Sequence, residues 1–310
     1  MWGVRDHRSL ADYGDAILGG RQAIPMMLDM FRHFGIHATW ATVGALFARN
    51  RDEMLAFAPE VRPQYTNPRL SPYPAMERQI GTDEREDPYH FGRSLLDQIA
   101  ETPGQEIATH TFGHIYALEP GMTGAAWQAD LQAAQAIADH AGHHLRSIVF
   151  PRNQFDAHAI DHCQQLGLNC YRGNPPGWAY DPRPGDDLSA VLRMARFLDG
   201  ALPLFGGMAF DAPASGNGIL DVPASRFLRP WNARFPLYSR LHQARVIREM
   251  TAAARSGQCY HLWWHPHNMG RDTAQNMAQL TAILRAFDGL RDRFGFESVT
   301  MAQCVPKGGA

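Results

Sequence analysis

Apolar positions along the chain follow two periods. Segments with apolar residues three and four positions apart predict amphipathic helices, and short apolar runs between them predict buried strands. We expect helices over residues 21–35, 92–101, 125–142, 157–167, 241–257 and 273–295. We expect strands over residues 36–44, 106–110, 146–150, 168–172, 259–264 and 297–301, with a further apolar segment at 218–225. Strands that alternate with helices indicate βα units and a parallel sheet, and six or seven units favour a barrel.

Two stretches interrupt this alternation. Residues 58–90 and 172–186 are rich in proline and aromatic residues and carry neither period. Long irregular segments inside a compact domain are usually functional loops or disordered ones. We therefore expect one domain over residues 1–310 with irregular insertions at about 58–90 and 172–186, since 310 residues suit one large α/β domain at least as well as two small ones.

Composition narrows the function classes. The formal net charge is −2, so no global field attracts nucleic acid, and we expect no nucleic-acid partner. No apolar run is long enough to span a bilayer, and no N-terminal stretch has the layout of a signal peptide, so we expect a cytoplasmic protein. The four cysteines form no C-x-x-C pair, which argues against a zinc ribbon or a thioredoxin-like site.

Polar and ionisable residues recur where the predicted strands end. In a parallel α/β barrel, chemistry takes place at the carboxyl ends of the strands. The residues at these positions are His110, His114, Arg152, Asn153, Arg172, Arg226, His265 and His267. Each residue alone is weak evidence, but the set predicts an active site at one end of the barrel.

His110 and His114 follow the strand at 106–110. Imidazoles four residues apart on one helical turn face the same way and can bind one divalent ion. Catalytic zinc needs a third protein ligand and a water molecule, so the pair alone is an incomplete site. The alternative is two hydrogen-bonded histidines without a ligand, because a chain with 15 histidines contains such spacings by chance.

The apolar strand at 259–264 ends at Trp264 and His265. Histidine is the usual general acid near neutral pH, and His265 would point from the strand end into the site. Alternation places one of Trp263 and Trp264 in the core and leaves the other to face a sugar ring; we assign Trp264, together with His267, to substrate binding. The alternative for His265 is a hydrogen-bonded histidine at a strand end.

These segments resemble the motifs of the polysaccharide deacetylases, the NodB-homology carbohydrate esterases. "THTFGH" resembles the family's H-(S/T)-x-x-H metal motif, "FPRNQ" its arginine segment, "HLWWHP" its last motif with the catalytic histidine, and "GIHATWATVG" the strand after its first helix. The order agrees from about residue 20 to the end. The resemblance implies a distorted (β/α) barrel, a divalent metal that is most often zinc, and hydrolysis of an N-acetyl or O-acetyl group on a saccharide.

The resemblance also implies roles. His110 and His114 become metal ligands, and His265 becomes the general acid that protonates the leaving amine. Arg152 and Arg226 become groove residues, and we add Asn153 and Arg172 to the substrate-binding set because they also stand at strand ends. In the family's chemistry the metal polarises the acetyl carbonyl and lowers the pKa of its bound water, and a carboxylate takes the water's proton.

The chain departs from the family at its first motif, an acidic pair that supplies the base and the third metal ligand. The opening "MWGVRDHRSL" contains no strand followed by such a pair. Three interpretations remain: the acids lie upstream of Met1, another acid substitutes (Asp6, or one of Asp83 to Asp87), or the protein binds without hydrolysing. A barrel without its first strand would also expose two strand edges.

Three functions therefore stay open. The first is a metal-dependent saccharide deacetylase in surface-polysaccharide or glycan metabolism. The second is an allantoinase-like hydrolase that cleaves a small non-sugar C–N bond on the same scaffold. The third is a carbohydrate-binding pseudoenzyme, which the missing acidic pair favours. A groove lined with aromatic side chains would favour a sugar, and a small closed pocket the second function.

Overall fold

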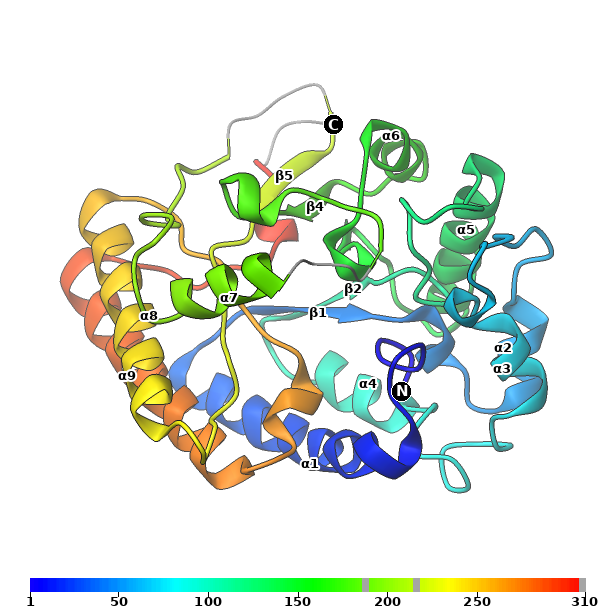
Figure 1. The fold of residues 1–310 in the computed structure, drawn as a ribbon, viewed down its shortest axis with the longest axis horizontal. Helices are drawn as coiled ribbons and strands as arrows, with labels where there is room; N and C mark the ends of the chain where they lie inside the picture. The colour runs from blue at the N-terminus through cyan, green and yellow to red at the C-terminus, as the bar shows by residue number, and fades with distance from the viewer. Residues whose placement is uncertain (186–189, 214–217, 307–310) are drawn as a thin grey trace.

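The computed structural model describes residues 1–185, 190–213 and 218–306 (Figure 1). Five parallel strands pair in chain order, and two more parallel strands form a second sheet. The first sheet contains β1 (Ala38–Thr42), β2 (Gln105–Thr109), β3 (Ser147–Ile148), β4 (Cys170–Gly173) and β5 (Leu220–Pro223). The second contains β6 (Arg226–Phe227) and β7 (Leu262–Trp263). The parallel sheet and the chain order of its strands agree with the prediction.

The two sheets are joined because β5 and β6 are consecutive parts of one bent segment. On one side of the bend, the Ala224 amide donates to the Gly173 carbonyl at 2.9 Å, which extends the pairing with β4. On the other side, the Leu228 amide donates to the Trp263 carbonyl at 2.7 Å, which extends the pairing with β7. The strands thus run from β1 to β7 as a distorted (β/α) barrel, and the predicted fold class is confirmed.

The barrel is not closed by hydrogen bonds between β7 and β1 in the part of the chain that the structure describes. Helix α1 (Leu10–Phe34) lies at this opening. The ring of Phe31 contacts Trp40 of β1 and Trp264 next to β7, with ring centroids 6.1 and 6.2 Å apart. Side-chain packing therefore takes the place of a strand ladder on this side of the barrel.

Helix α1 begins well before the predicted boundary because Ser9 and Asp12 form a capping box. Its Gly19 and Gly20 lie against the backbone of the 3₁₀ turn η5 (Pro266–Met269) and Gly270. A Cβ atom on Gly19 would lie 2.0 Å from the Gly270 carbonyl oxygen, so only glycine permits this approach. The contact fixes the segment that follows β7, where His265 and His267 lie.

The other helices surround the sheets. They are α2 (Arg51–Phe57), α3 (Tyr73–Arg78), α4 (Arg93–Ala100), α5 (Gly124–His140), α6 (Ala157–Gln165), α7 (Ala190–Asp199), α8 (Pro236–Ser256) and α9 (Thr273–Phe294). Figure 1 shows α8 and α9 side by side at one end of the molecule and α5 and α6 toward the other. Within the described residues, no helix combines the length and apolarity that a membrane span requires.

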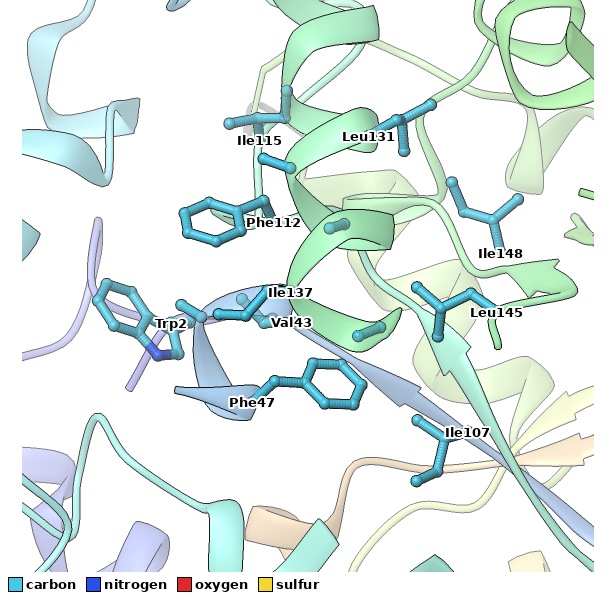
Figure 2. Close-up of a cluster of buried hydrophobic side chains, with 14 of the residues drawn as sticks. Trp2, Val43, Phe47, Ile107, Phe112, Ile115, Leu131, Ile137, Leu145 and Ile148 are labelled. Atoms are coloured by element: carbon cyan, nitrogen blue, oxygen red, sulfur yellow. The ribbon is translucent and has the colours of Figure 1, made fainter. Parts of the chain in front are cut away.

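The core has two main parts. One lies around α5, where Phe112, Leu131 and Ile137 pack with Phe47 and Ile148 from the neighbouring strands and turns (Figure 2). The other lies among α1, α8 and α9. Trp2, at 3% exposure, belongs to the first part, so the N-terminal segment is anchored in the core beside the strand ends.

Two predictions about local structure need correction. Residues 297–301 form no strand: Ser298 Oγ bonds both backbone groups of His37, and the Met301 amide donates to Thr39 Oγ1, so side chains replace a ladder. The insertion at 58–90 is not wholly irregular, because it contains η2 (Pro68–Leu70) and α3. The insertion at 172–186 includes the end of β4 and the turn η4 (Trp178–Tyr180), and its last residue lies outside the described residues.

Candidate active site

The loop after β2 carries His110 and His114. The His110 amide donates to the Thr42 carbonyl at 2.8 Å and so continues the pairing of β2 with β1. Thr111 and His114 have φ values of 64° and 59°. The loop is therefore not the helical turn that the spacing predicted. Left-handed residues bring the two rings together instead, with centroids 4.7 Å apart.

Asp130 of α5 holds this loop in place. Its carboxylate accepts hydrogen bonds from the amides of Phe112 and Gly113 at 2.6 and 3.2 Å, and from the hydroxyl of Tyr73 at 2.5 Å. Complete burial raises the pKa of Asp130 to about 6. Asp130 is not among the predicted site residues, although a lone acid within the apolar face of a predicted helix is a usable signal.

The two imidazoles have nitrogens suited to ligand binding. His110 Nδ1 donates to the Val149 carbonyl at 2.5 Å, which leaves Nε2 with its lone pair. His114 Nδ1 is buried without a hydrogen-bond partner. Burial and then the nearby charge of Arg172 lower the pKa of His110 to about 3, against the effect of the Val149 bond. Burial and its cationic neighbours also lower the pKa of His114, so both rings are neutral at pH 7.

A divalent ion is the group that such a pair would bind. Two neutral imidazole nitrogens suit this purpose, and the unpaired Nδ1 of buried His114 fits it as well. Among residues 1–185, 190–213 and 218–306, however, no group of three histidine, cysteine, aspartate or glutamate side chains is arranged to hold a metal. The described residues therefore supply two of the three protein ligands that catalytic zinc uses.

Of the predicted substitutes for the third metal ligand, Asp6 is the one that the described contacts connect to the histidine pair. Its side chain is 2% exposed and accepts hydrogen bonds from the Arg152 guanidinium and, at 3.2 Å, from the Tyr116 hydroxyl. The Tyr116 ring in turn contacts His114, with centroids 5.4 Å apart. Asp87, one of the acids from Asp83 to Asp87 that were the other predicted substitutes, binds within its own loop, where it contacts the Gly81 amide and His90.

A cavity of about 390 Å³ opens beside the strand ends. His265, Trp263, Asn153 and Arg152 line it. His265 is an exposed residue that lines the cavity. Desolvation and the charge of Arg172 lower the pKa of His265, so the ring is neutral and able to accept a proton at pH 7.

Arg172 lies behind the Trp263 side of this cavity. Its guanidinium carbon lies 4.1 Å from the centroid of the Trp263 ring, and it donates to Asn153 Oδ1 at 2.6 Å. The residue is 8% exposed, and burial lowers its pKa to about 9. Arg152 and Asn153 have φ values of 54° and 55°, so strained backbone gathers at this site as it does at many functional sites.

The remaining predicted residues fall in three environments. Arg226 lines the cavity but is committed to ion pairs with Asp199 and Glu249. The ring of His267 stacks on that of His265, with centroids 5.1 Å apart. Trp264 packs against Phe31 and donates to Met27 Sδ, so it lies against the core. Trp263, and not Trp264, lines the cavity.

Comparison with known proteins bears on this arrangement. The model of the family described as polysaccharide deacetylase matches residues 12–171, more than half of the chain. The chain belongs to the polysaccharide deacetylase family. The match covers β1, the histidine loop after β2, the Arg152 segment and the start of β4. His265, which the last family motif implies, lies outside it.

One solved structure supports the fold of this deacetylase-family chain. A GH57-type branching enzyme from the hyperthermophilic archaeon Pyrococcus horikoshii aligns with a TM-score of 0.50 and 12% identity over 97% of this chain and 67% of its own. A Mycobacterium smegmatis protein assigned to the polysaccharide deacetylases aligns with a TM-score of 0.48 and 15% identity over 91% of this chain and 74% of its own. The search of curated proteins finds no significant match.

Proposed function

We propose that this protein is a hydrolase that removes an N-acetyl or O-acetyl group from a saccharide. The observation that carries the proposal is His265, a neutral and solvent-accessible imidazole in a cavity beside the strand ends, in a chain of the polysaccharide deacetylase family. Trp263 lines the same cavity, and aromatic side chains commonly pack against sugar rings. This wall favours a saccharide over a small non-sugar amide.

His265 can serve as base and acid in turn. A neutral ring can take a proton from the attacking water and then deliver it to the leaving amine or alkoxide. We assign both proton transfers to His265, because it lines the cavity and its ring is neutral at pH 7. The Arg172 charge disfavours the imidazolium form and thereby drives delivery of the proton to the leaving group.

The proposal includes a divalent ion, most often zinc in this family, held by Nε2 of His110 and by His114. When bound, such an ion would polarise the acetyl carbonyl and acidify a water molecule. The hydrogen bond from His110 Nδ1 to Val149 orients the ring for this purpose, and Asp130 orients the loop that carries both histidines.

Acetate release tests the proposal. The purified protein is incubated with a panel of acetylated oligosaccharides, and released acetate is measured for the wild type, His265→Ala and the exposed control His158→Ala. We expect His265→Ala to lower the rate by about 10²–10⁴-fold, the usual contribution of a general acid–base, and His158→Ala to leave it unchanged. Equal rates for the wild type and His265→Ala would refute the role of His265.

Metal content provides an independent readout. We expect about one divalent ion for each wild-type chain purified without chelator. We expect His110→Ala to lose the ion, because a single remaining imidazole would bind it too weakly. No ion in either protein would refute the metal site.

A second candidate function is carbohydrate binding without hydrolysis. The observation that favours it is the absence of a third metal ligand next to His110 and His114 in the described part of the chain. Saccharide binding without acetate release, in a protein that also contains no metal, would support this function over the first.

A further inference from the structure

The wall of the cavity is strongly cationic. Among the described residues that line it, one is acidic, Asp181, and five are arginines: Arg152, Arg183, Arg196, Arg226 and Arg229. Two of the five, Arg152 and Arg226, are paired with carboxylates. The other three have no ion pair within residues 1–185, 190–213 and 218–306, so the described part of the wall carries an excess of positive charge.

The three unpaired arginines are anchored by backbone carbonyls. Arg196 Nε donates to the Ala179 carbonyl at 2.7 Å, Arg229 donates to the Arg196 carbonyl at 2.8 Å, and Arg183 donates to the Trp178 carbonyl at 2.8 Å. A carbonyl oxygen satisfies one donor and orients the side chain, but it does not neutralise the charge. Each guanidinium therefore keeps donors and charge for a further partner.

Arg172 adds a buried charge behind the same wall. Its Nε has no hydrogen-bond partner, and in the described chain its contacts are the Asn153 oxygen and the Trp263 ring, both neutral. The indole Nε1 of Trp263 is also buried and unpaired. A buried cation without a counter-ion is unfavourable, and unpaired buried donors add to that cost. Both features become favourable when acceptor oxygens with negative charge lie nearby.

We infer that the saccharide bound in this cavity carries an anionic group, a carboxylate or a phosphate, that lies against Arg196 and Arg229. The inference rests on the proposed function for the identity of the rest of the substrate. Carboxylate and phosphate are the groups whose paired oxygens match the fork of a guanidinium. Because His265 lines the same cavity, the anionic group and the acetyl group belong to one substrate molecule.

Binding of matched sugars tests the inference. The full chain is titrated calorimetrically with N-acetylglucosamine, its 1-phosphate, and the carboxylate-bearing N-acetylmuramic acid. At low salt we expect at least one anionic sugar to bind about tenfold or more tightly than the neutral one, and this ratio to fall as salt is added. Preference for the phosphate or for the carboxylate identifies which anion the site takes.

Variants locate the preference on the wall. The double variant Arg196→Gln/Arg229→Gln is expected to bind all three sugars alike. Arg193→Gln is the matched control, because Arg193 is an exposed arginine of the same helix, α7, outside the cavity lining. It is expected to keep the wild-type ratio. If the double variant fails to fold, the single variants and the salt dependence of the wild type make the same test.

Three outcomes overturn the inference: equal binding of neutral and anionic sugars, a preference that survives in the double variant, or no binding of any sugar at millimolar concentration. Acetate release measured in parallel separates this result from the proposed function. Release from neutral sugars at the same rate as from anionic ones refutes the anion site alone. A preference for anionic sugars without acetate release refutes the hydrolase alone.

Discussion

Arg226 on β6 and Arg172 on β4 are both buried arginines at strand ends, but their surroundings differ. Arg226 binds Glu249 with two parallel hydrogen bonds of 2.6 and 2.8 Å and reaches Asp199 at 3.2 Å. Arg245 bonds the same two carboxylates. Although burial opposes it, the bond and charge of Glu249 raise the pKa of Arg226. The result is a balanced network of two cations and two anions.

Within the described residues, Arg172 has no such network. Burial is the cause that lowers its pKa to about 9, with no carboxylate to oppose it, and its hydrogen bond goes to a neutral amide. Position at a strand end does not distinguish an arginine of a structural ion pair from an arginine that could bind a ligand, but the presence or absence of a carboxylate partner does. A buried charge with partners of opposite sign belongs to a structural network that is costly to break, and a buried charge without such partners is a candidate for ligand binding.

The largest expected effect is on the balanced network. Replacing Arg226 by Met leaves two buried carboxylates with Arg245 alone, so we expect the free energy of unfolding to fall by about 3–5 kcal/mol. Urea denaturation measures this change. Arg291→Met is the control: its pair with Asp288 is 43% exposed on both sides, and we expect its loss to cost less than about 1 kcal/mol. Similar losses in both variants would contradict the assignment.

The fold was largely predictable because its signals are local. The alternation of apolar periods located the strands up to β4 and most helices within a few residues, and it indicated the parallel order. The prediction failed at residues 297–301, where side chains of Ser298 and Thr39 replace backbone pairing. It also missed the capping box of Ser9 and Asp12 that extends α1. These bonds come from polar side chains, and the spacing of apolar residues does not predict them.

The site was predictable as a set of residues but not as an arrangement. Strand-end position selected His110, His114, Arg172 and His265, which the structure brings together, whereas of the two adjacent tryptophans it is Trp263, and not the selected Trp264, that lines the cavity. Register on a two-residue strand cannot decide which of Trp263 and Trp264 faces the core; packing against Phe31 does. Charge compensation was likewise invisible, because Arg226 meets its partners only in three dimensions.

The second prediction concerns pH and a buried histidine, His242, that lies next to the balanced network. His242 is 1% exposed; its Nδ1 donates to the Gly200 carbonyl and its Nε2 accepts from the Arg229 amide. Burial, more than the opposing Gly200 bond, lowers its pKa to about 4, below the value of about 6.5 in an unfolded chain. The stability this neutral histidine provides is therefore complete above pH 6.5 and is lost as pH falls toward 4.

We expect this contribution to reach about 3 kcal/mol, measured as the difference between the wild type and His242→Gln in the fall of the urea unfolding free energy from pH 7 to pH 4. His242→Gln should show a smaller loss over this range than the wild type. His158→Gln, at an exposed position, should match the wild type. An equal pH dependence in all three proteins would contradict the burial of an uncharged His242.

The smallest expected effect has the opposite sign. Replacing Arg172 by Met removes a buried charge that no carboxylate of the described residues compensates, so the free energy of unfolding should stay unchanged or rise by about 1 kcal/mol, in contrast to Arg226→Met. The Arg172 charge also lowers the pKa of His261, after the larger effect of burial. A nuclear magnetic resonance titration should therefore find the pKa of His261 higher in Arg172→Met than in the wild type. A destabilised variant with an unchanged His261 pKa would contradict this prediction. It would mean that Arg172 stabilises the fold as Arg226 does, although the two arginines have different partners.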